Sequence, residues 1–118
     1  MTEADIQIQL VDYLRLVAPQ RGFLFFAVPN EGMGEARTGA GLGRMARLKR
    51  MGLRSGVADL VFVKDGQAYF LEMKGHGGRW SDKQQDFARD AAHVGAKYGI
   101  AWSFEQALKI LKLWAIIT

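Results

Sequence analysis

The sequence predicts an α/β protein whose mixed β-sheet is flanked by helices, in an α/β/α layer arrangement. Segments with helical spacing and short apolar segments typical of strands follow each other as helix, strand, helix, hairpin, helix, strand, helix. Both faces of the hairpin strands are largely apolar, which is typical of strands inside a sheet that helices cover on both sides. The 118 residues are enough for one domain, residues 1–118, and leave no room for a second.

The first helix is expected from about Glu3 to Val17. Thr2 can cap it, with Asp5 as the acid of a capping box. The segment "FLFFAVPN", residues 23–30, is expected to form a buried strand that Pro29 stops. Helical spacing relates the apolar positions Ile6, Leu10, Tyr13, Leu14 and Val17.

The middle of the chain combines a glycine-dense loop with a basic helix. The segment "NEGMGEARTGAGLG", residues 30–43, predicts the loop. The following helix is expected to end at Gly52. Its single apolar face contains Leu42, Met45, Leu48 and Met51.

Two capping patterns mark the helices of the second half. Ser81 with Gln84 predicts the start of one helix, and Ser103 with Gln106 the start of the last, which runs to about Lys112. Between them "KYGIAWS", residues 97–103, alternates as a strand, and the tail 113–118 could add a short one. The apolar face of the first of these helices contains Phe87, Ala91 and Val94.

Composition excludes several classes of protein. No apolar segment approaches the roughly 20 residues of a membrane span, and the N-terminal segment lacks the basic start of a signal peptide. Cysteine is absent, so a disulfide framework and a thiolate metal site are excluded. We therefore expect a cytoplasmic protein with no membrane partner.

Basic residues are concentrated in one segment. The chain has 16 basic and 12 acidic residues, but residues 37–54 contain six basic side chains and no acid. Such a cluster can bind the phosphates of a polyanion, or it can simply be the solvated face of a helix. Its members are Arg37, Arg44, Arg47, Lys49, Arg50 and Arg54.

The hairpin at residues 56–75 contains two carboxylates in otherwise apolar strands. Asp65-Gly66 is a strong signal for a type I′ turn, which would pair Lys64 with Gln67. Five residues further from the turn on each strand, this register places Asp59 opposite Glu72, with Cβ atoms about 5 Å apart. Lys74 then projects from the same face as Glu72, because strand side chains alternate.

Opposed carboxylates need a compensating charge. Like charges that face each other across a strand pair are destabilising, and a hard cation such as Mg²⁺, which takes carboxylate oxygens, removes that cost. A nearby lysine could orient or deprotonate a water molecule and stabilise charge that builds on a phosphate. Alternatively, Asp59 and Glu72 are edge acids that reach solvent beside an ordinary lysine.

Other polar residues could join this site. Glu3 shares a helix face with Gln7, Leu10 and Leu14, although favourable placement beside the helix dipole also explains it. Gln84 points inward with Phe87, although its capping role explains it nearly as well. His76 and His93 have no partner at ligand spacing, so we expect them to be surface residues and not catalytic ones. The segment "GHGGRW" lacks the lysine of a phosphate-binding loop, so a nucleotide site is not expected there.

Together these motifs resemble the VRR-NUC (virus-type replication-repair nuclease) domain, a family of the PD-(D/E)XK nuclease superfamily. The resemblance, to the short stand-alone form that phages often encode, spans about Glu3 to Leu111. It rests on the order and spacing of "TEADIQ", "PN", "GVADL", "LEMKG" and "WSDKQ". The sequence departs from the family pattern at Ala58, where the motif usually has proline.

The resemblance implies a PD-(D/E)XK restriction-endonuclease-like core. It also assigns a role to each of several residues of a catalytic site. Asp59 and Glu72 would be metal ligands together with the Met73 backbone carbonyl. Lys74 would be the catalytic lysine, and Gln84 the glutamine that supports it. The first-helix acid would be Glu3, or Gln7 would occupy that position.

The resemblance also implies the reaction and the partners. A Mg²⁺- or Mn²⁺-dependent endonuclease is expected, selective for DNA structure and cutting at flaps or four-way junctions during replication, repair or recombination. It would act as a homodimer in the cytoplasm of a bacterial or phage-infected host cell and need no small-molecule cofactor. Two alternatives remain at this point: a non-catalytic DNA-binding or adaptor subunit on the same fold, and an RNA-directed nuclease.

Overall fold

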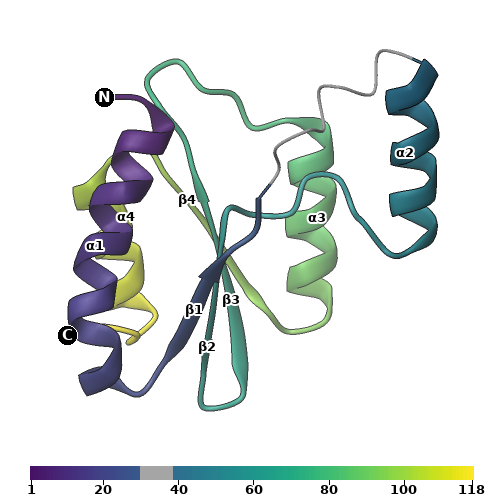
Figure 1. Ribbon diagram of the computed structural model, residues 1–118. Helices are drawn as coiled ribbons and strands as arrows, with labels where there is room; N and C mark the ends of the chain where they lie inside the picture. The colour runs from purple at the N-terminus through teal and green to yellow at the C-terminus, as the bar shows by residue number, and fades with distance from the viewer. Residues whose placement is uncertain (30–38) are drawn as a thin grey trace.

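A computed structural model describes residues 1–29 and 39–118 of the chain. The helices and strands follow each other in the order that the sequence predicts (Figure 1). They are α1 (Glu3–Arg21), β1 (Leu24–Ala27), α2 (Gly39–Arg50), β2 (Leu60–Lys64), β3 (Gln67–Met73), α3 (Asp82–His93), β4 (Lys97–Ala101) and α4 (Phe104–Leu113).

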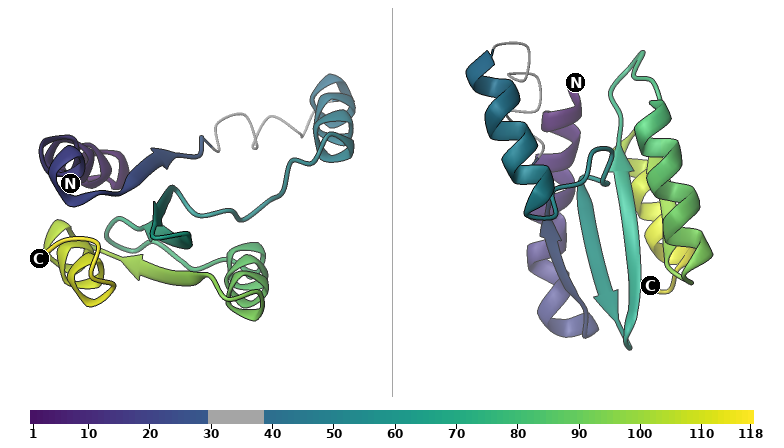
Figure 2. Two further views of the ribbon diagram at one scale, coloured as in Figure 1. Left: turned by 90° about the horizontal axis from the view of Figure 1, so that it is seen from below. Right: turned by 90° about the vertical axis from the view of Figure 1, so that its right-hand side faces the viewer.

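The strands form one mixed sheet in the order β1-β2-β3-β4. β1 and β3 each pair antiparallel with β2, whereas β3 and β4 are parallel because α3 connects them. Helices α1 and α4 cover one face of the sheet and α3 covers part of the other (Figure 2). α2 stands away from the sheet on the side of α3 (Figures 1 and 2). The expected mixed sheet flanked by helices is confirmed.

The β2–β3 hairpin has the register that the turn residues predict. Asp65 and Gly66 both have positive φ, 52° and 76°, as a type I′ turn requires. Lys64 pairs with Gln67 and Leu60 with Leu71. Asp59 directly precedes Leu60, and Glu72 directly follows Leu71, so the two acids lie opposite each other one step beyond the last pair.

The main core lies between the sheet and the two helices α1 and α4. β2 and β3 contribute alternate residues to it, so the side chains between them, including Asp59 and Glu72, face α3 instead. The two-residue period of a strand is therefore sufficient to place the apolar core residues on one face and the two acids on the other. The buried members of the core are Ile6, Leu10, Leu14, Phe23, Leu60, Phe62, Leu71, Met73, Ala101, Ala107, Leu111, Ile116 and Ile117.

β1 is shorter and more exposed than the sequence predicts. It ends at Ala27, and Asn30 lies outside the described residues. Leu24 and Phe26 are 61% and 48% exposed, because β1 is an edge strand and α3 does not extend over it. The prediction of a fully buried strand at this position was wrong.

α2 differs from its prediction in two respects. It begins at Gly39, inside the segment predicted as a loop, of which residues 30–38 lie outside the described part. Its apolar face does not pack as a unit, since Met45 is buried but Leu42 and Met51 are 56% and 74% exposed. The physical reason is that α2 stands away from the sheet, so most of this face has no core to cover.

α1 begins as predicted and ends later. Thr2 and Asp5 form the expected capping box, and the helix continues past Val17 through Pro19 to a left-handed cap at Gly22 with φ of 70°. Although α1 has 19 residues, no helix within 1–29 and 39–118 has both the length and the apolar character to cross a bilayer.

Two smaller expectations near the C-terminus were wrong. Val94 is 80% exposed, because α3 ends at His93 and Val94 is only its cap. The tail forms no strand; instead Ile116 and Ile117 pack into the core after a turn in which Ala115 has φ of 60°.

Candidate active site

A pocket of about 290 Å³ lies where β2 and β3 meet the N-terminal ends of α1 and α3. It brings together the five residues that the sequence and the family resemblance nominate as catalytic. A larger open groove of about 630 Å³ adjoins it and shares Glu3 and Asp59. Gln7 lines that groove, so of the two first-helix candidates it is Glu3 that lines the pocket. The pocket is lined by Glu3, Gly56, Val57, Asp59, Glu72, Lys74, Ser81 and Gln84.

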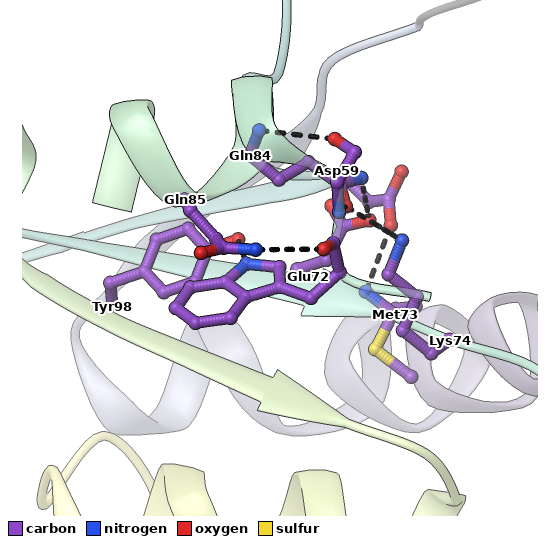
Figure 3. Close-up of polar contacts among 9 residues, drawn as sticks. Asp59, Glu72, Met73, Lys74, Gln84, Gln85 and Tyr98 are labelled. Carbon is purple, nitrogen blue, oxygen red and sulfur yellow. Dashed lines mark hydrogen bonds and ion pairs between the residues drawn. The ribbon is translucent and has the colours of Figure 1, made fainter. Parts of the chain in front are cut away.

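The polar side chains of the pocket contact one another directly (Figure 3). Asp59 Oδ2 accepts a hydrogen bond of 2.8 Å from the Met73 backbone N–H. Lys74 Nζ lies 3.3 Å from Glu72 Oε2. Glu72 and Lys74 are only 2% and 6% exposed, so Glu72 is not an edge acid that reaches solvent, whereas Asp59 is partly exposed.

Gln84 connects the start of α3 to the charged pair. Its Oε1 accepts hydrogen bonds from the Ser81 backbone N–H at 3.0 Å and from Lys74 Nζ at 2.8 Å. Its Nε2 donates to Glu72 Oε2 at 2.7 Å. The capping role and the site role, which the sequence presents as alternatives, are therefore performed by one side chain at the same time.

The two carboxyl groups resist simultaneous ionisation. Burial raises the pKa of Glu72 to about 7; the neighbouring Asp59 raises it as well, while Lys74 opposes the shift. Burial also raises the pKa of Asp59, and the hydrogen bond from Met73 partly offsets this effect. A proton shared between two opposed carboxylates is the expected result near neutral pH.

Two glycines allow the backbone to close around the pocket. Gly56 has φ of 83°, and a Cβ at this position would lie 2.3 Å from the Lys83 carbonyl oxygen, so only glycine lets this segment reach α3. At Gly75 a Cβ would lie 3.1 Å from the backbone nitrogen of Glu3. These close approaches hold the first turns of α3 and α1 against the strands that carry the acids.

The donor set fits a hard divalent cation. Glu72 Oε1 is buried and has no hydrogen-bond partner among the described residues, so it is available for a cation. Asp59 and Glu72 provide opposed carboxylate oxygens, the ligand type that Mg²⁺ prefers when water completes its octahedron. In residues 1–29 and 39–118, no group of three or more His, Cys, Asp or Glu side chains is arranged around one point. The fit therefore rests on two carboxylates.

The basic segment is divided by the fold. Arg44, Arg47, Lys49 and Arg50 are exposed on α2, and Arg37 lies outside the described residues. Arg54 pairs with Asp90 on α3, with 2.5 Å between Nη2 and Oδ2, and its guanidinium lies 5.3 Å from the centre of the Phe87 ring. Arg54 thus joins the segment after α2 to α3.

Several residues of the site carry little signal in a single sequence. The sequence pattern identifies Ser81 only as a helix cap, although this residue also lines the pocket. Gly56 and Gly75 matter because of backbone contacts with residues that are far away in the chain. Lys83 lies with Lys49 and Arg54 in a recess of about 270 Å³ between the segment after α2 and α3. Only a three-dimensional structure reveals these proximities.

The raised pKa of Glu72 predicts how the stability of the metal-free protein depends on pH. The folded state holds a proton up to about pH 7, whereas an unfolded glutamate with pKa near 4.5 releases it earlier. The free energy of unfolding should therefore fall as pH rises from about 4.5 to above 7, by at most about 3 kcal/mol. Chemical denaturation in a chelator at several pH values measures this.

Glu72→Gln should flatten this pH dependence, because the side chain no longer titrates. Glu105→Gln, an exposed acid in the first turn of α4, is the matched control and should keep the wild-type profile. A Glu72→Gln profile as steep as that of the wild type would show that another group causes the dependence.

Comparison with known families agrees with this geometry. The family model described as the VRR-NUC domain matches residues 4–104, which includes the pocket residues Asp59, Glu72, Lys74 and Gln84. No curated protein and no solved structure matches the chain. The family is a nuclease family of the PD-(D/E)XK superfamily, and its members generally use divalent metal ions. From the match, the sheet and the pocket together, the chain belongs to the VRR-NUC domain family.

Proposed function

We propose that this nuclease domain, residues 1–118, is a metal-dependent, structure-selective DNA endonuclease that hydrolyses phosphodiester bonds in branched DNA. The observation that carries the proposal is the buried contact of Glu72 with Lys74 beside Asp59, with Gln84 bonded to both members of the ion pair. A pair of opposed acids costs stability unless it binds a cation, so a purely structural role explains the arrangement poorly.

In this proposal Asp59, Glu72 and the Met73 backbone carbonyl hold Mg²⁺ or Mn²⁺. The burial of Glu72 and the unpaired Oε1 support its role as a ligand. When bound, the cation supplies positive charge that polarises a phosphoryl oxygen and makes water a better nucleophile. Glu3 lies at the rim of the same pocket, where its carboxylate can accept a hydrogen bond from water or help to position the cation.

Lys74 is proposed to stabilise the negative charge that develops on the phosphate. Its ammonium is held by Gln84 Oε1 and by Glu72 Oε2, so its position is fixed before substrate binds. A preorganised charge in a buried site stabilises a transition state more than a mobile charge in water does. Gln84 is then a positioning residue that orients both Lys74 and Glu72.

The DNA is proposed to contact the basic residues of α2. They are exposed, and the recess that contains Lys49, Arg54 and Lys83 lies next to the α3 end of the pocket. Action as a homodimer stays a prediction from the family resemblance. Leu24 and Phe26, exposed on the edge strand β1, are a candidate contact surface between two copies.

The deciding experiment is cleavage of single-stranded, duplex, flap and four-way DNA by the purified protein, with Mg²⁺ and with Mn²⁺. We expect branched DNA to be cut fastest. Asp59→Asn and Glu72→Gln should each abolish cleavage but leave DNA binding nearly unchanged, because phosphate contacts lie on other residues. Normal DNA binding without cleavage of any substrate would favour the adaptor alternative, and preferred cleavage of RNA the RNA-directed one.

The role of Lys74 can be separated from that of the metal. Lys74→Ala should lower single-turnover cleavage by about 10²- to 10⁴-fold, the range for the loss of a positioned charge or proton donor. Calorimetric titration should still show Mn²⁺ binding, since lysine is not a ligand. Lys74→Arg should restore activity only in part, because a planar guanidinium differs from a compact ammonium. Loss of metal binding in Lys74→Ala would mean that Lys74 only maintains the shape of the site.

The basic face of α2 should bind phosphates without reading sequence. Arg47→Gln or Arg50→Gln should weaken binding to all DNA sequences alike and make the dependence of log K on log salt concentration shallower by about 0.9. Lys109→Gln removes the same charge from α4, on the opposite side of the sheet, and should leave the slope unchanged. If all three variants and the wild type have equal slopes, the basic face of α2 is only solvated and does not contact DNA phosphates.

A further inference from the structure

A second groove lies between α3 and the edge strand β4, outside the pocket that holds the acids. Its volume is about 650 Å³, within the range of pockets that bind ligands. Small residues form much of its lining, and an aromatic pair, Trp80 and Tyr98, is part of it. Its lining residues are Trp80, Gln85, Ala88, Arg89, Ala92, Gly95, Ala96, Lys97 and Tyr98.

Trp80 is held in place and remains open to solvent. Its Nε1 donates to the Tyr98 hydroxyl oxygen at 3.3 Å, and the two ring centroids are 6.2 Å apart with 32° between the ring planes. Gln85 Nε2 donates to the Trp80 backbone carbonyl at 3.0 Å. The side chain is nevertheless 39% exposed, although burial would gain free energy for so large an apolar group.

The charged residues of the groove are all basic. Arg89 and Lys97 line it, and in the described part of the chain no acidic side chain does. Arg89 pairs with Asp86 at 3.0 Å, yet its side chain is 71% exposed and can reach a second anion. An exposed aromatic ring beside cations is the combination that binds single-stranded nucleic acid, with the ring stacking on a base and the cations contacting the phosphates.

The groove begins where the pocket ends. Trp80 directly precedes Ser81, which lines the pocket and caps α3 with Gln84. Gln85 directly follows Gln84 on α3, and in the view of Figure 3 Gln85 and Tyr98 lie on the side of the site away from Lys74. A strand whose phosphate lies in the pocket can therefore continue along α3 into the groove.

We propose that this groove binds an unpaired single-stranded DNA segment adjacent to the cut site and that Trp80 stacks on one of its bases. The inference rests on the proposed nuclease function and specifies the form of its substrate. Base pairs in the interior of a duplex keep both faces stacked, so Trp80 can stack only on a base that is unpaired, at a junction or at a duplex end. A flap or a branch point supplies such a base.

Binding of an eight-residue oligothymidylate in the presence of a chelator tests this inference without catalysis. Trp80→Ala should weaken binding by about 5- to 150-fold, the effect of losing one base–aromatic stack. Trp80→Phe keeps a ring and should retain most of the affinity. Binding of relaxed, closed-circular duplex DNA, which has no open end, should change less than twofold in both variants.

Trp102→Ala is the matched control, because Trp102 is 42% exposed and does not line the groove. It should bind the oligonucleotide as the wild type does. Lys97→Gln should make the salt dependence of single-strand binding shallower by about 0.7, and Lys109→Gln should not. Circular dichroism and thermal melts confirm that each variant is folded.

The outcomes separate this inference from the proposed function. The groove inference is overturned if Trp80→Ala binds single-stranded DNA with wild-type affinity, or if it loses the same affinity for single-stranded and duplex DNA. This holds even if the protein cuts DNA. A selective loss supports the groove even if no DNA is cut with any metal, an outcome that would refute the endonuclease proposal alone.

Discussion

The register of the β2–β3 hairpin is the constraint on which the site depends. The Asp65-Gly66 turn pairs Lys64 with Gln67, and strand alternation then decides where every later residue points. A slip of one residue would turn the acids toward the apolar core and bring core side chains to the pocket. The hydrophobic face that packs on α1 and α4 opposes such a slip, so the burial of leucine and phenylalanine also positions Asp59 and Glu72.

In the pocket, the hydrogen bonds that form the end of a helix also orient the charged side chains. Gln84 caps α3 and orients Glu72 and Lys74, so the helix end and the charged pair are formed together. The close backbone approach at Gly56 keeps α3 near the strands. The unfavourable feature is the proximity of two acids, of which Glu72 is buried and Asp59 is partly buried.

The sequence predicts the hairpin and the helix caps because each depends on patterns within a few residues. Local patterns leave the roles of Glu3 and Gln84 open, and only the family resemblance nominates these two residues for the pocket. Prediction from the sequence fails where burial depends on partners that are distant in the chain. An apolar strand and an apolar helix face look buried in the sequence, but Phe26 and Met51 are exposed because no element covers them. The sequence places Arg54 among the candidate DNA-binding residues but does not reveal its ion pair with Asp90, 36 residues away. No single-sequence pattern reveals that Gly56 touches Lys83.

The position of α2 has a consequence for its dynamics. Its 12 residues include Gly39, Gly41 and Gly43, each of which lowers helix propensity by about 1 kcal/mol relative to alanine. A helix of this length is marginal in water without tertiary contacts, and most of its apolar face is exposed. Its backbone amides should therefore exchange with deuterium through local opening, well before those of β2 and β3. A phosphate backbone bound to its arginines would slow that exchange, so part of the free energy of binding would be used to order the helix.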